Sequence, residues 1–95
     1  MKRIEIICNN SIYEDFEDIF SDLQITAYTK IENVHGVGTE GEKWGDAVWP
    51  QENFILVIYC EDDRLASLRD SFRILKSNFP GEGLKMFVSD AEMIL

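Results

Sequence analysis

The feature that most constrains this chain is the order in which its hydrophobic periodicity changes. Four short runs alternate polar with apolar residues or are almost wholly apolar, as strands are, and they lie at residues 2–8, 25–34, 54–60 and 84–88. Two longer segments, residues 9–24 and 61–79, instead space their apolar residues three and four positions apart, as amphipathic helices do. The predicted order of elements is therefore β-α-β-β-α-β.

The two helical segments each have one apolar face. In the first, Ser11 stands three positions before Glu14, which is the spacing of a capping box. Its apolar face consists of Ile12, Phe16, Ile19, Phe20 and Leu23. The second is expected to take Asp62 or Asp63 as its N-cap. Its apolar face consists of Leu65, Leu68, Phe72, Leu75 and Phe79. Two such helices over one face of a four-stranded antiparallel sheet give a ferredoxin-like α+β fold.

The length of the chain indicates one domain. Its 95 residues are too few for two hydrophobic cores, so residues 1–95 are predicted to fold as a unit. Residues 36–53 are rich in glycine and acid, have no periodicity, and are predicted to form a long irregular loop. Cys8 and Cys60 each end a strand, and the two strands are antiparallel neighbours in this fold. We therefore expect the two cysteines at opposite ends of the sheet, without a disulfide.

The charge balance excludes some partners. Nine Lys and Arg residues against 18 Asp and Glu give a net charge of −9, which repels nucleic acid and anionic membrane surfaces. No apolar run approaches the ~20 residues of a membrane helix, and Glu5 interrupts the apolar run near the N-terminus. We therefore expect a cytoplasmic protein that does not insert into membranes.

Catalytic groups are scarce. The chain has one histidine, and no serine, cysteine or lysine stands in a nucleophile motif. Carboxylates are plentiful, but those of the first helical segment fall on its outer side, as expected of a solvated face. The sequence therefore predicts a protein that is not an enzyme.

Two glycine-containing segments could offer backbone amides to an anion. The first is HGVGTEG, residues 35–41, and the second is GEGLK, residues 81–85, in which Lys85 adds a positive charge. The fold returns both to one end of the sheet. The alternatives are that the glycines only permit positive φ in flexible loops and that the lysine protects a sheet edge from aggregation.

Four stretches of the sequence carry a family likeness: MKRIEIIC, ITAYTKIENVHGVGTEG, EDDRLASLRDSF and PGEGLKMFVSDAEMI. Together they resemble the nitrogen-regulatory PII signalling family and its wider PII-like superfamily, over the whole chain. The resemblance implies a ferredoxin-like protomer in a compact homotrimer. It also implies that an adenine nucleotide such as ATP, ADP or AMP lies in the cleft between neighbouring subunits.

The resemblance assigns roles to particular residues. Residues 36–53 correspond to the family's T-loop, which contacts a target protein such as a membrane transporter or an enzyme. The segment after Pro80 is similar to its B-loop. The positions that would line a phosphate site are Gly36, Gly38, Gly81, Gly83 and Lys85. The sequence departs from the family pattern in having Leu84 between Gly83 and Lys85, and in having no tyrosine in the loop.

Trp44 and Trp49 lie in this loop, in a polar setting. Exposed tryptophans often anchor a partner, so they are candidate partner-binding residues. The alternative is that they fold back over the sheet or into a subunit interface.

Two other functions remain open. His35 and Cys60 are the available ligands for a metal-binding or metal-tolerance-related trimeric protein. The third hypothesis is a structural or interaction module without a ligand, because the sequence after the last strand, SDAEMIL, carries none of the phosphate-binding arginines of the family.

Overall fold

The computed structural model describes residues 1–38, 41–43 and 52–95. Its strands are β1 (Lys2–Asn9), β2 (Thr29–Val34), β3 (Gly36–Gly38), β4 (Gly41–Lys43), β5 (Asn53–Cys60) and β6 (Leu84–Asp90). Its helices are α1 (Tyr13–Asp22) and α2 (Leu65–Asn78), and each follows directly on one turn of 3-10 helix, η1 (Asn10–Ile12) and η2 (Asp62–Arg64).

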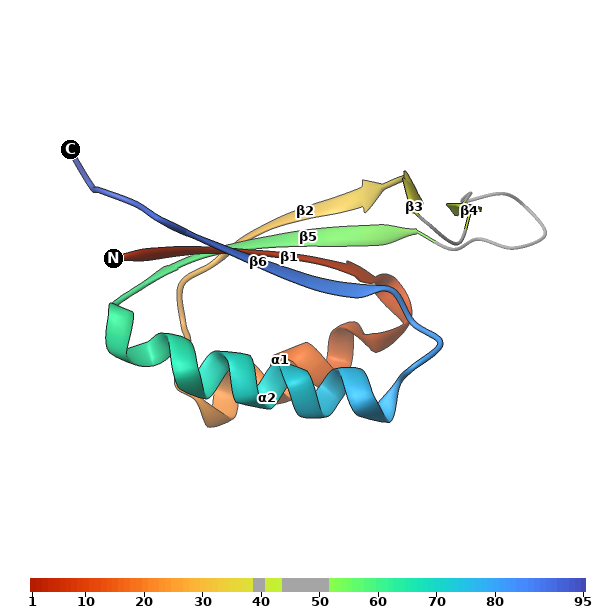
Figure 1. Ribbon diagram of the computed structural model, residues 1–95, viewed down its shortest axis with the longest axis horizontal. Helices are drawn as coiled ribbons and strands as arrows, with labels where there is room; N and C mark the ends of the chain where they lie inside the picture. The colour runs from red at the N-terminus through yellow and green to blue at the C-terminus, as the bar shows by residue number, and fades with distance from the viewer. Residues whose placement is uncertain (39–40, 44–51) are drawn as a thin grey trace.

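Four strands form one sheet in the order β2-β5-β1-β6, with every neighbouring pair antiparallel. Both helices cover the same face of this sheet, and the other face carries no helix among the described residues (Figure 1). The predicted ferredoxin-like arrangement is confirmed. In the register of β1 and β5, Cys8 lies opposite Phe54 and Lys2 opposite Cys60. The two cysteines are therefore at opposite ends of the sheet, and no disulfide joins them.

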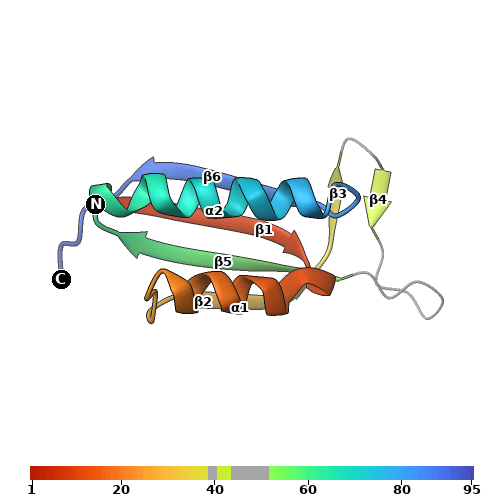
Figure 2. The ribbon, with the colours of Figure 1, turned by 90° about the horizontal axis from the view of Figure 1, so that it is seen from below.

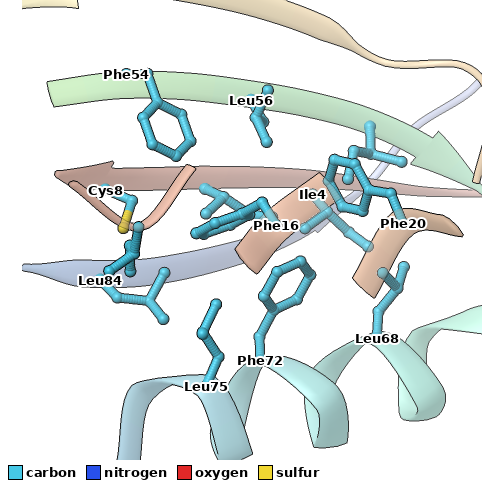
Figure 3. Close-up of a cluster of buried hydrophobic side chains, with 13 residues drawn as sticks. Ile4, Cys8, Phe16, Phe20, Phe54, Leu56, Leu68, Phe72, Leu75 and Leu84 are labelled. Carbon is cyan, nitrogen blue, oxygen red and sulfur yellow. The ribbon is translucent and has the colours of Figure 1, made fainter. Parts of the chain in front are cut away.

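The core fills the space between the helices and the sheet. Its centre is Phe16, whose ring centroid lies 5.2 Å from that of Phe54 on β5 and 4.9 Å from that of Phe72 on α2 (Figure 3). The predicted apolar faces of both helices are confirmed: they supply Ile12, Phe16, Phe20, Leu68, Phe72 and Leu75 to the buried set. Packing of one aromatic ring against both layers fixes the helices over the sheet, since such pairs add ~0.5–1.5 kcal/mol each beyond area burial.

The start of the first helix differs from the capping box predicted at Ser11. The buried side chain of Asn9 is the cap, because its Oδ1 accepts a hydrogen bond from the backbone N–H of Ser11 at 2.9 Å. This cap initiates the 3-10 turn η1, and α1 continues from it without a side-chain cap of its own. The cap is two residues earlier than predicted because the helical path begins directly where β1 ends.

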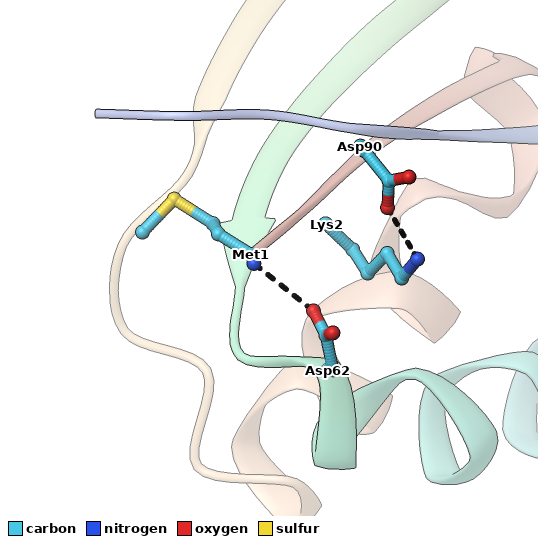
Figure 4. Close-up of polar contacts among 4 residues, drawn as sticks. All are labelled: Met1, Lys2, Asp62 and Asp90. Carbon is cyan, nitrogen blue, oxygen red and sulfur yellow. Dashed lines mark hydrogen bonds and ion pairs between the residues drawn. The ribbon is translucent and has the colours of Figure 1, made fainter. Parts of the chain in front are cut away.

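The start of the second helix also differs from the prediction. Neither Asp62 nor Asp63 is the N-cap, since both belong to the first turn of η2, which Glu61 precedes without a side-chain cap bond. Asp62 instead binds the amino group of Met1 at 3.0 Å, and Lys2 pairs with Asp90 beside it (Figure 4). These contacts tie the starts of β1 and α2 to the end of β6.

Two segments between the helices differ from the predicted boundaries. The strand expected from residue 25 begins at Thr29, because the backbone N–H of Ile25 donates to Phe20 O at 2.8 Å and Gln24 has a φ of 57°. The loop expected at residues 36–53 is not wholly irregular. Its first part pairs as an antiparallel ladder between β3 and β4, with Val37 opposite Glu42.

Candidate functional site

One end of the sheet gathers the predicted glycine segments. Val34, the last residue of β2, lies opposite Asn53 at the start of β5. Asn53 also lies opposite Asn9 at the end of β1, and the neighbouring Cys8 lies opposite Leu84 at the start of β6. The glycines that follow β2 and those that precede β6 are therefore at the same end, as the fold predicted from the sequence requires. We call this end of the sheet the glycine end.

The two segments begin at different corners of the glycine end, and β3 then runs across this end from the β2 side toward the side of β6 and α2 (Figure 2). They adjoin β2 and β6, which are the opposite edge strands of the sheet. Three inter-strand spacings of ~4.8 Å separate these edges, or about 14 Å in all. β3 also leaves β2 on the side of the sheet away from the helices (Figure 1), whereas the chain between α2 and β6 turns on the helix side (Figures 1 and 2).

Backbone hydrogen bonds hold the second glycine segment in place. Glu82 N donates to Phe79 O at 3.0 Å, which closes the turn after α2. Asn9 N donates to Gly83 O at 3.2 Å, which ties this turn to the end of β1. Asn9 thus connects the glycine turn to the start of the first helix, a role that the sequence analysis missed. An asparagine before a helical run is a capping signal, and it could have been read as one.

Two of the glycines are not required by the chain's own conformation. A Cβ atom added to Gly36 or Gly81 would meet no atom within 4 Å, and neither residue has a φ in the left-handed region. The alternative in which these two glycines only permit positive φ is therefore wrong at both positions. Both are exposed, so their backbones are accessible at the surface of the glycine end.

Lys85 lies one residue inside β6, opposite Ile7 of β1. Its neighbour Leu84 is buried under the helices, so Lys85 extends from the opposite face of the sheet, because successive side chains of a strand alternate. The side chain is exposed, and none of the ion pairs among the described residues involves it. Its positive charge is therefore available to a ligand.

His35 and Cys60 do not come together within one chain. His35 follows the end of β2 that pairs with Asn53, and Cys60 is at the other end of β5, seven residues along. A rise of ~3.3 Å per residue separates these ends by about 23 Å. Burial raises the pKa of the Cys60 thiol, which disfavours the thiolate that a metal needs. Among residues 1–38, 41–43 and 52–95, no group of three or more His, Cys, Asp or Glu side chains could hold a metal ion.

The entrance to loop 36–53 has contacts that the sequence analysis missed. His35 Nε2 lies 3.8 Å from Glu52 Oε1, and Glu52 O accepts a hydrogen bond from Asn10 N at 2.9 Å. Asn33 has a φ of 57° where the pairing of β2 with β5 shifts register, so the chain turns just before His35. Asparagine tolerates this conformation better than most residues, which is the signal that could have located the bulge. Trp44 and Trp49 lie outside the described residues.

The face of the sheet away from the helices is partly apolar, although Arg3 and Glu5 of the central strand β1 lie on it as an ion pair with an N–O distance of 3.7 Å. One row of paired residues crosses it from Ile31 through Ile55 and Ile7 to Lys85. Ile31 in this row is 46% exposed, and the larger Tyr59 and Phe87 beside the row are 55% and 53% exposed. We call this surface the bare face. A sheet face that met only water would be mostly polar by alternation, so the exposed Ile31, Tyr59 and Phe87 indicate a contact surface.

Within the part of the chain that the structure describes, no helix combines the length and the apolar character needed to cross a membrane.

Comparison with known proteins identifies relatives of the whole chain. The family model described as nitrogen regulatory protein P-II matches residues 1–94. A search among curated proteins finds no match.

Solved structures of PII-like proteins share the fold. CPII from Thiomonas intermedia K12, a nitrogen regulatory PII-like protein bound to ADP, AMP and bicarbonate, superposes with a TM-score of 0.78 at 21% identity. The match covers 95% of this chain and 84% of that one. The apo form of CPII gives 0.67 at 16% identity, covering 95% and 87% of the two chains. A putative PII-like signaling protein from Thermus thermophilus gives 0.60 at 17% identity, covering 93% and 83%.

Proposed function

The chain belongs to the nitrogen regulatory protein P-II family, and from this premise we propose that it is a non-enzymatic regulator that binds an adenine nucleotide. The nucleotide, of the ATP, ADP or AMP type, would lie in clefts between the subunits of a homotrimer. Its binding would change how loop 36–53, with Trp44 and Trp49, contacts a target protein. The target would be a transporter or an enzyme, and the setting would be the cytoplasm.

The observation that carries this proposal is the accessible backbone at Gly36 and Gly81. Neither steric crowding nor positive φ accounts for a glycine at either position. Glycine has one further use, which is to let another group approach the backbone closely. Amides exposed in this way bind phosphate oxygens well, since several N–H dipoles can point at one anion. Gly83 would contribute a further amide beside Gly81, whereas Gly36 and Gly38 are paired with Lys43 and Gly41 in the β3–β4 ladder and would contribute only the part of their backbone that this ladder leaves open.

Lys85 supports the proposal of a nucleotide site in the same way. The chain as a whole repels anions at a net charge of −9, so a phosphate needs a local cation that no carboxylate already neutralises. Lys85 is exposed, is two residues after Gly83, and takes part in none of the ion pairs among the described residues. The relative CPII, with which the chain shares its fold, is described as binding ADP, AMP and bicarbonate.

The bare face supports an oligomer. Ile7, Ile55 and Val57 are only partly buried in one chain although they lie on the central strands, and association would remove them from water. A ring of identical copies uses two different edges of each copy. It could therefore place the Gly36 corner of one copy beside the Gly81 corner of the next.

Thermal melting with a nucleotide series tests the proposal. ADP, AMP and ATP would each be added with and without bicarbonate, and Zn²⁺ and other divalent ions would form the series for the metal hypothesis. A nucleotide at about 100 times its Kd stabilises the folded state by ~2.7 kcal/mol. We expect a nucleotide to raise Tm and Lys85→Ala to remove the shift.

The matched control is Lys76→Ala, since Lys76 is an exposed lysine of α2 and its loss changes the net charge equally. It should leave the shift intact. A shift produced by metals alone, or a nucleotide shift that survives Lys85→Ala, would contradict the proposed site.

A further inference from the structure

A groove runs between the two helices on the side of the molecule away from the sheet. It has a volume of about 290 Å³ and is lined by Asp15, Asp18, Ile19, Ser71, Ile74, Leu75 and Asn78. α1 and α2 lie side by side over the sheet (Figure 2). The groove therefore opens on the layer opposite the bare face, and Asn78 at one end of it precedes Gly81 of the proposed nucleotide site by three residues.

The floor and wall of the groove are apolar. Leu75 is buried and Ile19 packs against the core, so both present apolar atoms from below. Ile74, in contrast, is 63% exposed although it lines the groove. An isoleucine left this accessible beside an apolar floor offers a site for one or two apolar side chains of a partner.

The α1 side of the groove is acidic without compensation. α1 has the sequence YEDFEDIFSD, with five carboxylates and no basic residue. Asp15 and Asp18 stand one turn apart on the groove side, and neither joins an ion pair among the described residues. The α2 side contributes the uncharged Ser71 and Asn78. The charge of the groove is therefore negative along one wall.

The basic residues of α2 do not neutralise this wall. Arg69, Arg73 and Lys76 follow one another at steps of four and three, so they form one row along α2. The groove-lining positions 71, 74, 75 and 78 form another row, and at 100° per residue the two rows point in nearly opposite directions. The basic row thus faces away from α1.

From this arrangement we propose that the groove is a docking site for a basic amphipathic helix of a partner protein. Lysine or arginine side chains of that helix would pair with Asp15 and Asp18, and its apolar side chains would pack on Ile74 and Ile19. Charge complementarity selects this occupant, because an acidic or neutral helix would leave the carboxylates desolvated and unpaired. A trimer formed through the bare face leaves the groove accessible, so one assembly could bind nucleotide and this partner at separate sites.

A labelled peptide tests this directly. The probe is a synthetic amphipathic helical peptide with lysines at positions i, i+3 and i+7 and leucines on the adjacent face. A peptide of the same composition in scrambled order is its control. Fluorescence anisotropy at low salt should show binding of the amphipathic peptide and weaker binding of the scrambled one. The protein is used as the full chain without nucleotide.

Two variants measure separately how the charges and the apolar contact of the groove contribute to peptide affinity. D15N with D18N removes both carboxylates of the groove, and we expect affinity to fall roughly five- to tenfold. I74S removes the exposed apolar contact without changing charge, and should weaken binding by a similar factor, roughly tenfold. The matched control is E61Q with D63N, which removes two exposed acids elsewhere and should leave affinity nearly unchanged.

Three results would overturn the proposal. The first is equal loss of affinity in the E61Q/D63N control, which would show attraction to bulk charge only. The second is equal binding of the scrambled peptide. The third is an NMR shift map in which the peptide perturbs the bare face or the glycine end in place of Ser71, Ile74 and Asn78.

Discussion

At the scale of single residues, Gly36 and Gly81 of the proposed site are not needed for the backbone conformation or for close packing. Glycine usually serves a turn by adopting positive φ, and replacement there is destabilising. Gly81 has no such φ, and a side chain would find open space at this position. A replacement of Gly81 can therefore be tested separately for its effect on stability and for its effect on ligand binding.

Gly81→Ala makes this separation. Alanine fits the native backbone and reduces the freedom of the unfolded chain, so the free energy of unfolding should stay the same or rise by ~0.4–1 kcal/mol. Nucleotide affinity should fall, because the new methyl group obstructs approach to the backbone. Urea unfolding and calorimetric titration measure the two quantities. If Gly81→Ala is less stable but binds nucleotide normally, Gly81 has only a structural role.

At the scale of elements, the sequence predicts where helices and strands lie better than where they begin. Both apolar helix faces were predicted because core contacts require their three- and four-residue spacing. The start of α1 was not, since it depends on Asn9, which tertiary contacts bury at the end of β1. Likewise β2 starts late because Ile25 is hydrogen-bonded to the end of α1, a contact that strand propensity does not encode.

The short ladder of β3 and β4 was missed for a related reason. Three of its six residues are glycines, at positions 36, 38 and 41, and glycine is depleted in strands. The end of the sheet at which the candidate site forms could be predicted from the order of elements. The contacts that shape that end could not, because Glu52 and Asn33 act through register and backbone geometry.

At the scale of elements, we predict the effect of replacing the cap residue Asn9. Asn9→Ala removes the side-chain acceptor for Ser11 N–H, and loss of such a cap costs ~1 kcal/mol. For a domain of this size, Tm should then fall by roughly 4–8 °C. Ser11→Ala is the control, and should change Tm little, because the Ser11 side chain does not cap the helix. Thermal unfolding followed by circular dichroism checks both. If Ser11→Ala lowered Tm more than Asn9→Ala does, the capping box at Ser11 and Glu14 would be the cap of the first helix.

At the scale of the whole molecule, the protein has three surfaces of different chemistry. The bare face carries exposed apolar side chains, the glycine end offers free backbone and one lysine, and the groove between the helices is acidic. We propose that copies meet through the first, the nucleotide binds at the second and a basic helix docks on the third. The two glycine segments adjoin opposite edge strands of the sheet, and we propose that neighbouring copies bring them together in one site.

Mixing two defective variants tests that proposal most directly. Gly36→Glu disables one corner by charge and bulk, and Lys85→Ala disables the other. Each variant alone should fail to bind nucleotide. When they are unfolded together and refolded at equal amounts, a ring pairs an intact Gly36 corner with an intact Lys85 corner at about one quarter of its interfaces.

Calorimetric titration of the refolded mixture gives the number of sites. We predict that about one quarter of the wild-type nucleotide sites return, with wild-type affinity, since each restored site combines intact groups from two chains. If both corners serve one nucleotide within a single chain, no mixed assembly contains an intact site. A mixture that binds no nucleotide, although size-exclusion chromatography shows that the two variants assemble together, would contradict the account.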